Sequence, residues 1–401
     1  MKDLHRKSFQ TRAVHAGERV PPADYTPVAT PIWPTVGYVY GSMDDLDAVF
    51  AKTKPGQIYL RYTSPTAMAF EAAVASLEEA EAAQAFASGM AAIHAALLAA
   101  GARSGTSVVA ALDVYGATFT LLTGLLAQMG VNVQLVDATN LYEVESALKE
   151  TKAIILLVET ISNPLLKVAD IPALAKMAHN HGASLLVDNT FASPYLFRPL
   201  EHGADYVIHS ATKYLSGHGD VLAGVVATSK ANKERLFDLN KLTGGTLAPF
   251  EAWLALRGLK TLPLRMRQQC QNAQRVAEWL TTQPKIARVI YPGLPSHPQH
   301  ALATKLLNGR GFGGVLSFEI AGADRAQAFR FMEALQLCLP ATSLGDIYSL
   351  IVHPASSSHR TLSAEERARV GIPEGLLRLS TGIEDAEDIL ADLEQALAKI
   401  G

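Results

Sequence analysis

The chain has 401 residues, of which 49% are apolar, so it is long enough for two or three domains with buried cores. Its formal net charge of −3 provides no basic surface for nucleic acid. Two cysteines, Cys270 and Cys338, lack metal-ligand spacing and do not suggest a disulfide framework. The N-terminus has no apolar signal core, and no apolar run is long enough for a membrane helix. We therefore expect a cytoplasmic protein with free thiols that binds neither nucleic acid nor membrane.

The N-terminal segment 1–62 is predicted to be largely irregular. Its stretch "ERVPPADYTPVATPIWPT" is rich in proline, which interrupts both helices and strand ladders. Tyr25, Trp33 and several apolar residues argue against complete disorder. An ordered arm that contacts another subunit is one interpretation, and a disordered tail is the other.

In the segment 63–255, short apolar runs alternate with helical patterns. The runs lack polar alternation, which is typical of strands buried on both faces of a sheet. The predicted strands are 107–112, 132–136, 153–159, 184–188, 205–209 and 222–228. The predicted helices are 66–82, 90–101, 117–129, 141–150 and 169–181. The alternation predicts an α/β fold with a mostly parallel central sheet covered by helices.

The segment 256–401 is predicted to form a smaller C-terminal α/β domain. One long helix over 248–283 leads into it. Short strands are expected near "ARVIYP", "GGVLSFEI" and "LLRLS", and a last amphipathic helix is expected over 385–399.

Polar residues collect after the predicted strands, where open α/β sheets bind ligands. Asp188 ends one strand, and Tyr115 follows another. Ser210, Thr212 and Lys213 follow a third strand in "HSATKYLSGHGD", Glu159 and Asn163 follow a fourth, and Gly89 and Met90 open a helix. Each feature alone has a structural explanation, such as a turn glycine, a helix N-cap, a packed tyrosine or a surface lysine. Independent structural causes would seldom place all of them on one edge.

This combination is suited to pyridoxal phosphate (PLP). The cofactor needs a lysine amine, here Lys213, and a carboxylate at its ring nitrogen, here Asp188. It also needs a flat partner, here Tyr115, and N–H groups and hydroxyls for its phosphate. Gly89, Met90, Ser210 and Thr212 would supply the phosphate site. Burial and a nearby cationic ring would lower the pKa of Lys213, which favours the neutral amine.

Four long motifs carry a family resemblance. "VETISNPLLKVADI", "LLVDNTFASPY", "HSATKYLSGHGD" and "LLRLSTGIED" occur in order and closely resemble the Cys/Met-metabolism (transsulfuration) family of PLP-dependent enzymes. The resemblance extends from "TRAVHAG" to the last helix. It implies PLP fold type I, the aspartate-aminotransferase-like fold, and a homotetramer built as a dimer of dimers.

The resemblance also implies roles for residues outside the strand ends. Tyr59 and Arg61, in "YLRYTSPT", would cross the dimer interface to the phosphate of the neighbouring subunit's cofactor. Arg378 would bind the substrate α-carboxylate, although an internal salt bridge is the structural alternative. Ser343 would lie near the lysine and the substrate carboxylate. Asn163 would bond near the cofactor's 3′ oxygen or the substrate carboxylate, and Glu159 would orient neighbouring groups.

The implied reaction is γ-elimination on methionine, homocysteine or cystathionine, giving a thiol, 2-oxobutanoate and ammonia. Lys213 would move the α-proton, and Tyr115 would protonate the leaving group. Thr342 stands where the family's cystathionine enzymes usually carry glutamate, which argues against recognition of a distal amino group. γ-Replacement with an activated homoserine ester and a thiol is the alternative. A dinucleotide-dependent dehydrogenase is disfavoured because no G-x-G-x-x-G follows the first strand, and a non-catalytic PLP-binding protein is disfavoured by Lys213, Tyr115 and Arg378.

Overall fold

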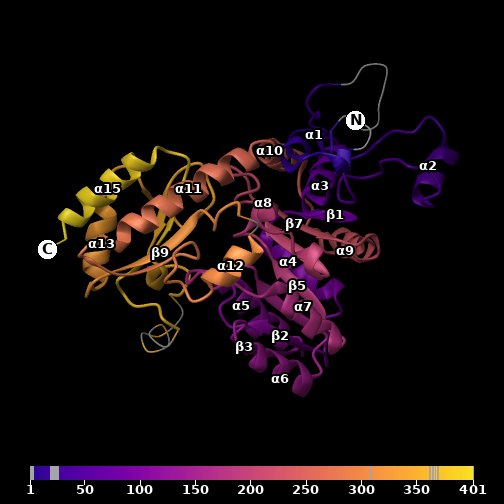
Figure 1. The fold of residues 1–401 in the computed structure, drawn as a ribbon. Coiled ribbons are helices and arrows are strands. Elements are labelled where there is room, and N and C mark those ends of the chain that lie inside the picture. The colour runs from indigo at the N-terminus through magenta and orange to yellow at the C-terminus, as the bar shows by residue number, and fades with distance from the viewer. Residues whose placement is uncertain are drawn as a thin grey trace.

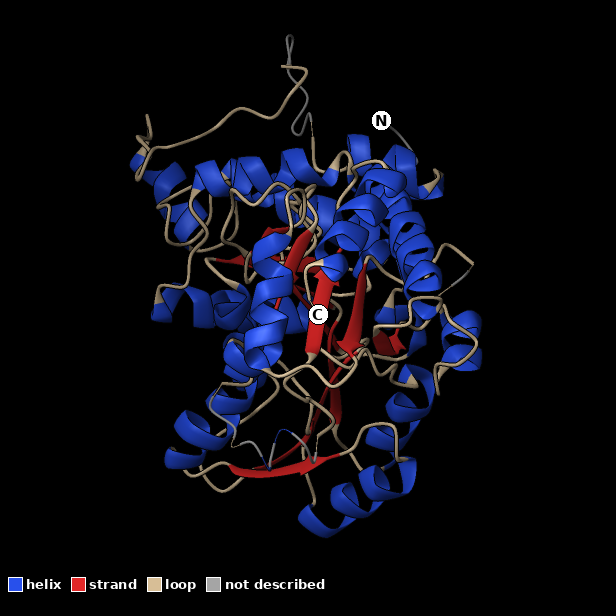
Figure 2. Ribbon diagram, turned by 90° about the vertical axis from the view of Figure 1, so that its left-hand side faces the viewer, coloured by secondary structure: helices blue, strands red, loops and turns tan. Residues whose placement is uncertain are grey.

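The computed structural model describes residues 4–18, 27–307, 309–360, 363, 365, 367 and 370–400. It contains two sheets that lie side by side along the molecule, each with its own packed helices (Figure 1). Helices enclose the strands on most sides (Figure 2). The proline-rich N-terminal stretch is described only in part, and the predicted contribution of Tyr25 lies outside the described residues.

The larger sheet has seven strands in the order β1-β7-β6-β5-β4-β2-β3. Its strands are β1 (Ala82–Phe86), β2 (Ser107–Ala111), β3 (Asn132–Val136), β4 (Ile155–Glu159), β5 (Ser184–Asp188), β6 (Tyr206–Ser210) and β7 (Gly224–Thr228). The strands from β6 to β3 are parallel, and β7 runs antiparallel to both β6 and β1. The mostly parallel sheet expected from the sequence is therefore present. The edge strand β1 was not predicted, because "AAQAF" has little of the β-branched character that marks strands.

Helices cover both faces of this sheet. They are α3 (Pro65–Glu78), α4 (Gly89–Ala99), α5 (Gly116–Thr120), the π-helical segment η2 (Leu121–Leu126), α6 (Leu141–Thr151), α7 (Ile171–Asn180), α8 (Ser193–Leu196), the 3-10 turn η3 (Pro199–His202) and α9 (Lys230–Thr243). The predicted helix over 117–129 is thus α-helical for one turn and π-helical after it. Helix α9 was not predicted.

The N-terminal segment is less irregular than expected. After the 3-10 turn η1 (Leu4–Arg6), it forms α1 (Phe9–His15) and α2 (Met43–Phe50). Serine side chains at Ser8 and Ser42 accept N–H bonds in the first turn of each helix, which is the usual N-cap arrangement. The prediction of an irregular segment was wrong at these two helices, because short helices with serine caps carry little apolar periodicity.

The single helix predicted over 248–283 is also wrong. Two helices occupy the segment, α10 (Pro249–Leu259) and α11 (Leu262–Thr281), and they are separated at Lys260 and Thr261. Pro263 lies in the first turn of α11, where its missing N–H costs nothing. The proline therefore begins the second helix.

The smaller sheet has five strands in the order β10-β11-β12-β9-β8. They are β8 (Ile286–Ile290), β9 (Val315–Ile320), β10 (Leu339–Pro340), β11 (Leu350–Val352) and β12 (Leu376–Ser380). It packs against α11, α13 (Arg325–Ala334), α15 (Ala386–Ala398) and the 3-10 turn η4 (Pro354–Ser356). The buried residues of α12 (His300–Leu306) belong instead to the core around the larger sheet. Strand β12 is antiparallel to both β9 and β11. The three strands near the quoted motifs are present, whereas the very short β10 and β11 were not predicted.

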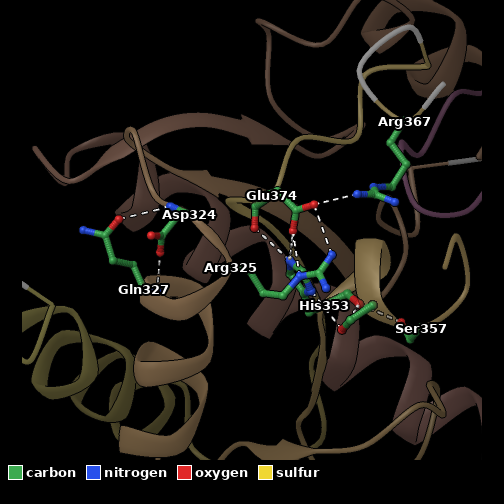
Figure 3. A network of polar contacts seen from close by, with 8 residues as sticks. Asp324, Arg325, Gln327, His353, Ser357, Arg367 and Glu374 are labelled. Carbon is green, nitrogen blue, oxygen red and sulfur yellow. Dashed lines mark hydrogen bonds and ion pairs between the residues drawn. The ribbon is translucent and has the colours of Figure 1, made fainter. Parts of the chain in front are cut away.

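Glu374, which lies just before β12, forms hydrogen bonds that hold the start of this strand in place. Its carboxylate accepts hydrogen bonds from Arg367 at 2.6 Å and from Arg325 at 3.0 and 3.2 Å (Figure 3). Its backbone carbonyl lies 2.7 Å from Nε2 of His353, which follows β11. These contacts hold together α13, the segment after β11 and the start of β12, and β12 contributes Arg378 to the site below.

Among the described residues, no helix combines the length and apolarity that crossing a bilayer requires. Cys270 and Cys338 are both buried and unbonded to each other.

Candidate active site

A cleft of about 210 Å³ lies where the carboxyl ends of β4, β5 and β6 face the smaller sheet. Its lining contains most of the residues predicted from the sequence. They are Gly89, Met90, Tyr115, Asn163, Asp188, Ser210, Thr212, Lys213 and Arg378, with Glu159 at the end of β4. The topology therefore brings together residues that lie up to 289 positions apart, between Gly89 and Arg378 (378 − 89).

The N-terminus of α4 forms one end of the cleft. Ser88 caps the helix by accepting a bond from the N–H of Ala91 at 3.1 Å. The N–H groups of Gly89 and Met90 belong to the first turn and have no intrahelical acceptor. A Cβ at Gly89 would lie 2.8 Å from Cβ of Ser210, so glycine permits the close approach of helix and strand.

The hydroxyl groups of Ser210 and Thr212, beside this helix end, differ in whether they are hydrogen-bonded to the backbone. Ser210 donates its backbone N–H to Oγ1 of Thr190 at 2.9 Å, and its side chain lies against Gly89. The hydroxyl of Thr212 is engaged with the backbone of Ala223, at 3.1 Å to the nitrogen and 3.2 Å to the oxygen. Of these two hydroxyl groups, that of Ser210 is therefore the more available for a phosphate.

Two carboxyl groups form the floor of the cleft. Burial raises the pKa of Asp188, while hydrogen bonds from Thr190, including one at 3.0 Å from its N–H, oppose the increase. Burial raises the pKa of Glu159 well above its usual value, and the charges of Asp188 and Asp113 add to the increase. Asp188 is the better supported carboxylate of the two, because Thr190 stabilises its ionised form.

Glu159 positions the tyrosine at the rim. Its Oε1 accepts the backbone N–H of Tyr115 at 2.6 Å. The Tyr115 side chain is 44% exposed, so the ring is free on the cleft side. This contact agrees with the expected orienting role of Glu159.

Lys213 lies half-buried opposite the carboxylates, and its Nζ donates to Oγ of Ser343 at 3.1 Å. Burial lowers the pKa of Lys213, and the positive charge of Arg378 lowers it further. Asp346 acts in the opposite direction. The amine thus lies in surroundings that favour its neutral, nucleophilic form.

Arg378 is a buried cation with neutral partners. Its Nη1 donates to Oδ1 of Asn163 at 3.0 Å, and its Nη2 donates to the carbonyl of Ser343 at 3.0 Å. Its Nε has no hydrogen-bond acceptor within the described part of the chain. Burial lowers its pKa to about 10. No carboxylate of the described chain forms a salt bridge with Arg378, so the structural alternative of an internal ion pair is not observed. A buried guanidinium in this state calls for an anion from outside the chain.

Tyr59 and Arg61 do not line the cleft of their own chain. Tyr59 is 43% exposed, and Arg61 donates to the carbonyl of Lys241 at 2.6 Å. The Arg61 guanidinium also lies over the rings of Tyr59 and Tyr62, at 5.5 and 5.3 Å from their centroids. The two predicted phosphate ligands are therefore together, at the surface and separate from the other site residues.

The residues present fit PLP. The cleft offers an amine of lowered pKa, a carboxylate held by Thr190 and free N–H groups at a helix start. The buried Nε of Arg378, which lacks an acceptor, adds a site for the carboxylate of an amino-acid substrate. These donors and acceptors are complementary to the cofactor and to its substrate class.

Several lining residues had no individual prediction. They are Ser88, Ile93, Ile161, Thr190, Phe191, Leu222 and Leu344. Ser88 could have been found, because a serine directly before Gly89 and a helical run is an N-cap signal. Leu222 and Leu344 carry no comparable signal, because an apolar residue in a loop is equally compatible with packing.

A larger cavity, of about 610 Å³, lies beside the cleft and shares Asn163 with it. Its main polar groups pair with one another, since Lys167 lies 3.0 Å from Asp137 and 3.8 Å from Asp113. Lys213, Asp188 and Arg378 do not line it. The smaller cleft is therefore the candidate active site.

Comparison with known proteins supports this assignment. The sequence pattern of the family "Cys/Met metabolism PLP-dependent enzyme" matches residues 10–398. L-methionine gamma-lyase from Fusobacterium nucleatum subsp. polymorphum is 44% identical over 97% of this chain and 98% of that protein. O-succinylhomoserine sulfhydrylase from Pseudomonas aeruginosa is also 44% identical, over 99% of this chain and 97% of that protein.

Similarity to solved structures is equally extensive. The crystal structure of the metY protein from Campylobacter jejuni subsp. jejuni matches with a TM-score of 0.91 and 32% sequence identity. The match covers 98% of this chain and 100% of the Campylobacter chain. The Campylobacter structure carries N′-pyridoxyl-lysine-5′-monophosphate. The methionine gamma-lyase and the sulfhydrylase named above have the same sequence identity to this chain, 44%. Sequence identity therefore does not decide between elimination and replacement, and the residues of the cleft must be considered.

Proposed function

This chain belongs to the Cys/Met metabolism family of PLP-dependent enzymes, and on that premise we propose that it is a carbon–sulfur γ-lyase. The substrate would be L-methionine, homocysteine or a related sulfur amino acid. The products would be a thiol, 2-oxobutanoate and ammonia. The observation that carries the proposal is the buried Arg378 without an anionic partner, joined through Ser343 to the amine of Lys213.

Substrate binding begins at Arg378. We infer that its free Nε–H and the remaining guanidinium donors hold the α-carboxylate, while Asn163 and the carbonyl of Ser343 keep the guanidinium plane fixed. This places the α-amino group of the substrate on the side of Lys213. Ser343 contacts Arg378 through its carbonyl and Lys213 through its hydroxyl, and so couples their positions.

Proton movement would be performed by Lys213 and Tyr115. When bound, PLP supplies an aldehyde that holds the substrate amine and a cationic ring that takes up the electrons released at the α-carbon. Nζ of Lys213 would accept the proton from the α-carbon, which requires the neutral amine that burial and Arg378 favour. A proton would then be lost from the β-carbon, and the electron pair of that C–H bond would form the Cβ–Cγ double bond as the Cγ–S bond breaks. The carboxylate of Asp188 would hold the ring nitrogen of the cofactor in its protonated form. The hydroxyl of Tyr115, at the open rim, donates the proton that the departing sulfur requires.

The charge of the cleft wall favours a thioether over substrates with a charged distal group. Among the described residues that line the cleft, the ionisable acids and bases other than Tyr115 are Glu159, Asp188, Lys213 and Arg378. All four are assigned above, which leaves no charged group for a distal amine or carboxylate. Thr342, Leu222 and Phe191 provide an uncharged outer wall that suits an uncharged γ-substituent.

The test is a product assay on the purified holoenzyme. We expect 2-oxobutanoate and thiol from methionine or homocysteine, and little thioether from O-succinylhomoserine supplied with a thiol. The second candidate, γ-replacement, is favoured by the equal similarity to the sulfhydrylase. Rapid thioether formation with little keto acid would establish replacement and refute the lyase proposal.

We further propose that the active enzyme is a homotetramer of two dimers with shared active sites. The separation of Tyr59 and Arg61 from their own cleft supports this arrangement, because exposed phosphate ligands could serve a neighbouring subunit. Mixing Lys213→Ala subunits with Arg61→Ala subunits should restore activity that neither parent has. Absence of restoration in verified mixed dimers would refute sharing.

A cytoplasmic location is part of the same proposal, since both cysteines are free.

A further inference from the structure

Three neighbouring strands end in pairs of polar residues that point in opposite directions. The pairs are Glu159–Thr160 at the end of β4, Asp188–Asn189 at the end of β5 and His209–Ser210 at the end of β6. One residue of each pair lines the cleft, namely Glu159, Asp188 and Ser210. The remaining partners, Thr160, Asn189 and His209, are fully buried on the opposite face of the sheet. Alternation of side chains along a strand explains this division, because Glu159 is aligned with Asp188, and Asp188 with Ile208.

A single carboxyl group on α3 joins the residues behind the sheet. Oε1 of Glu78 lies 2.6 Å from Nε2 of His209 and accepts a bond from Nδ2 of Asn189 at 3.1 Å. Oδ1 of Asn189 in turn accepts the hydroxyl of Thr160 at 2.7 Å. One connected network therefore ties together the ends of β4, β5 and β6, directly beneath the cleft.

The charges of this network are enclosed. Glu78 and His209 are both fully buried. Among the described residues, His209 is the one basic group that forms a salt bridge with Glu78, whereas the adjacent Glu79 pairs with Arg12 and Arg198. A buried carboxylate is stable when a cation balances it. Oε2 of Glu78 and Nδ1 of His209 have no hydrogen-bond partners in the part of the chain that the structure describes, so each group depends chiefly on the other.

We propose that Glu78 and His209 are positioning residues for the PLP site: a buried ion pair that fixes three strand ends and supplies positive charge behind Asp188. Burial raises the pKa of Asp188, and the proximity of His209 opposes that increase, which supports the electrostatic part. The inference rests on the proposed role of Asp188 at the cofactor's ring nitrogen. It adds a function for two residues that neither line the cleft nor contact a substrate.

The charged groups around Asp188 define the expected pH effect. They are Glu159 from β4, His209 from β6, and Lys213 and Arg378, which line the same cleft. Loss of the His209 charge removes a group that favours ionised Asp188, so the pKa of Asp188 should increase. Protonated Asp188 cannot hold a protonated ring nitrogen. PLP affinity should therefore fall, on acidification, at a higher pH in the variant than in the natural protein.

The experiment measures the dissociation constant of PLP as a function of pH for five forms of the protein. They are the natural chain, Glu78→Gln, His209→Gln, the double variant that carries both changes, and the control Glu71→Gln. We expect roughly tenfold weaker PLP binding at pH 6 for the first two variants, with the loss decreasing at higher pH. The double variant should lose no more than the larger single effect, because the pair acts as one unit.

Glu71 is a matched control. It lies on the same helix two turns before Glu78, is also buried, and accepts bonds from Gln84 at 3.0 Å and from the N–H of Ala85 at 2.9 Å. Its contacts reach β1 and, through Lys233 at 3.8 Å, α9, and not the ends of β4, β5 and β6. Glu71→Gln should lower the melting temperature of the apoprotein and leave the pH dependence of PLP binding unchanged.

The outcomes separate this inference from the proposed function. Unchanged PLP binding in both Glu78→Gln and His209→Gln would overturn the inference, as would equal changes in Glu71→Gln. If Glu78→Gln does not fold, His209→Gln decides, because glutamine can still donate to Glu78 while lacking the charge. A natural chain that does not bind PLP would instead refute the proposed function itself.

Discussion

The two sheets contribute to one cleft in different ways. In the larger sheet the neighbouring strands β4, β5 and β6 are parallel, so their carboxyl ends deliver Glu159, Asp188 and Ser210 to a single edge. In the smaller sheet β12 runs antiparallel to both neighbours, and it delivers Arg378 alone. The larger sheet thus provides the proposed cofactor site, and the smaller sheet provides the proposed substrate anchor. The comparison predicts that changes in the two halves should have separable effects.

The largest effect is expected in the larger half, at Lys213. Lys213→Ala should reduce kcat by at least on the order of 10⁴-fold, because it removes both the covalent anchor and the group that moves the α-proton. Steady-state assays with methionine and a visible absorption spectrum would measure it. Retention of more than a few per cent of activity would contradict the assigned role.

A smaller and different effect is expected at Arg378. Arg378→Ala should raise KM by roughly 100-fold through loss of charge-assisted hydrogen bonds, while the PLP content stays close to that of the natural protein. Arg275→Ala is a suitable control, since this exposed arginine of the same half is bound to Glu387 away from β12. A parallel loss of PLP content and substrate affinity would identify Arg378 as structural.

Charged residues of the smaller half should also shift the pKa of Lys213, which follows a strand of the larger sheet. Arg378 lowers the pKa of Lys213, and Asp346 raises it, so Arg378→Gln and Asp346→Asn should shift that pKa in opposite directions. The arginine variant leaves less neutral amine at a given pH, and the aspartate variant leaves more. The rate at which apoprotein takes up PLP, measured against pH, reports the shift. Shifts of the same sign in both variants would refute this electrostatic account.

The smallest effects are expected at helix caps that face away from the cleft. Ser229 caps α9 in the larger half, and Asp324 forms a capping box with Gln327 in α13 of the smaller half. Replacement of either cap by alanine should cost about 1 kcal/mol in the free energy of unfolding. Chemical denaturation would measure the cost, and KM for methionine should not change. A change in KM would show that the caps influence the cleft.

The same contrast between the sheets explains how far the sequence could predict the fold. Strands β2 to β7 are continuous apolar runs, because both faces of a parallel sheet are buried, and all six were predicted. Strand β1 escaped prediction because alanine and glutamine carry no strand signal. The strands β10 and β11 have two and three residues, which is too short for any periodicity.

The site was predictable to the extent that its residues follow strands. Asp188, Ser210 and Lys213 follow directly from that rule. Arg378 gave a weaker signal, as a charge inside an apolar strand, and its partners Asn163 and Ser343 could be joined to it only by the fold. The contact between Glu78 and His209 spans 131 positions, and although His209 opens the motif "HSATKYLSGHGD", only the fold shows that Glu78 is its partner.

The central claim is that Lys213 holds PLP covalently at the edge of the larger sheet. Borohydride treatment of the native holoenzyme, followed by proteolysis and mass spectrometry, tests it most directly. We expect a single pyridoxyl-labelled peptide that contains Lys213. A label on a different lysine, or no label on protein that contains PLP, would refute this role of Lys213.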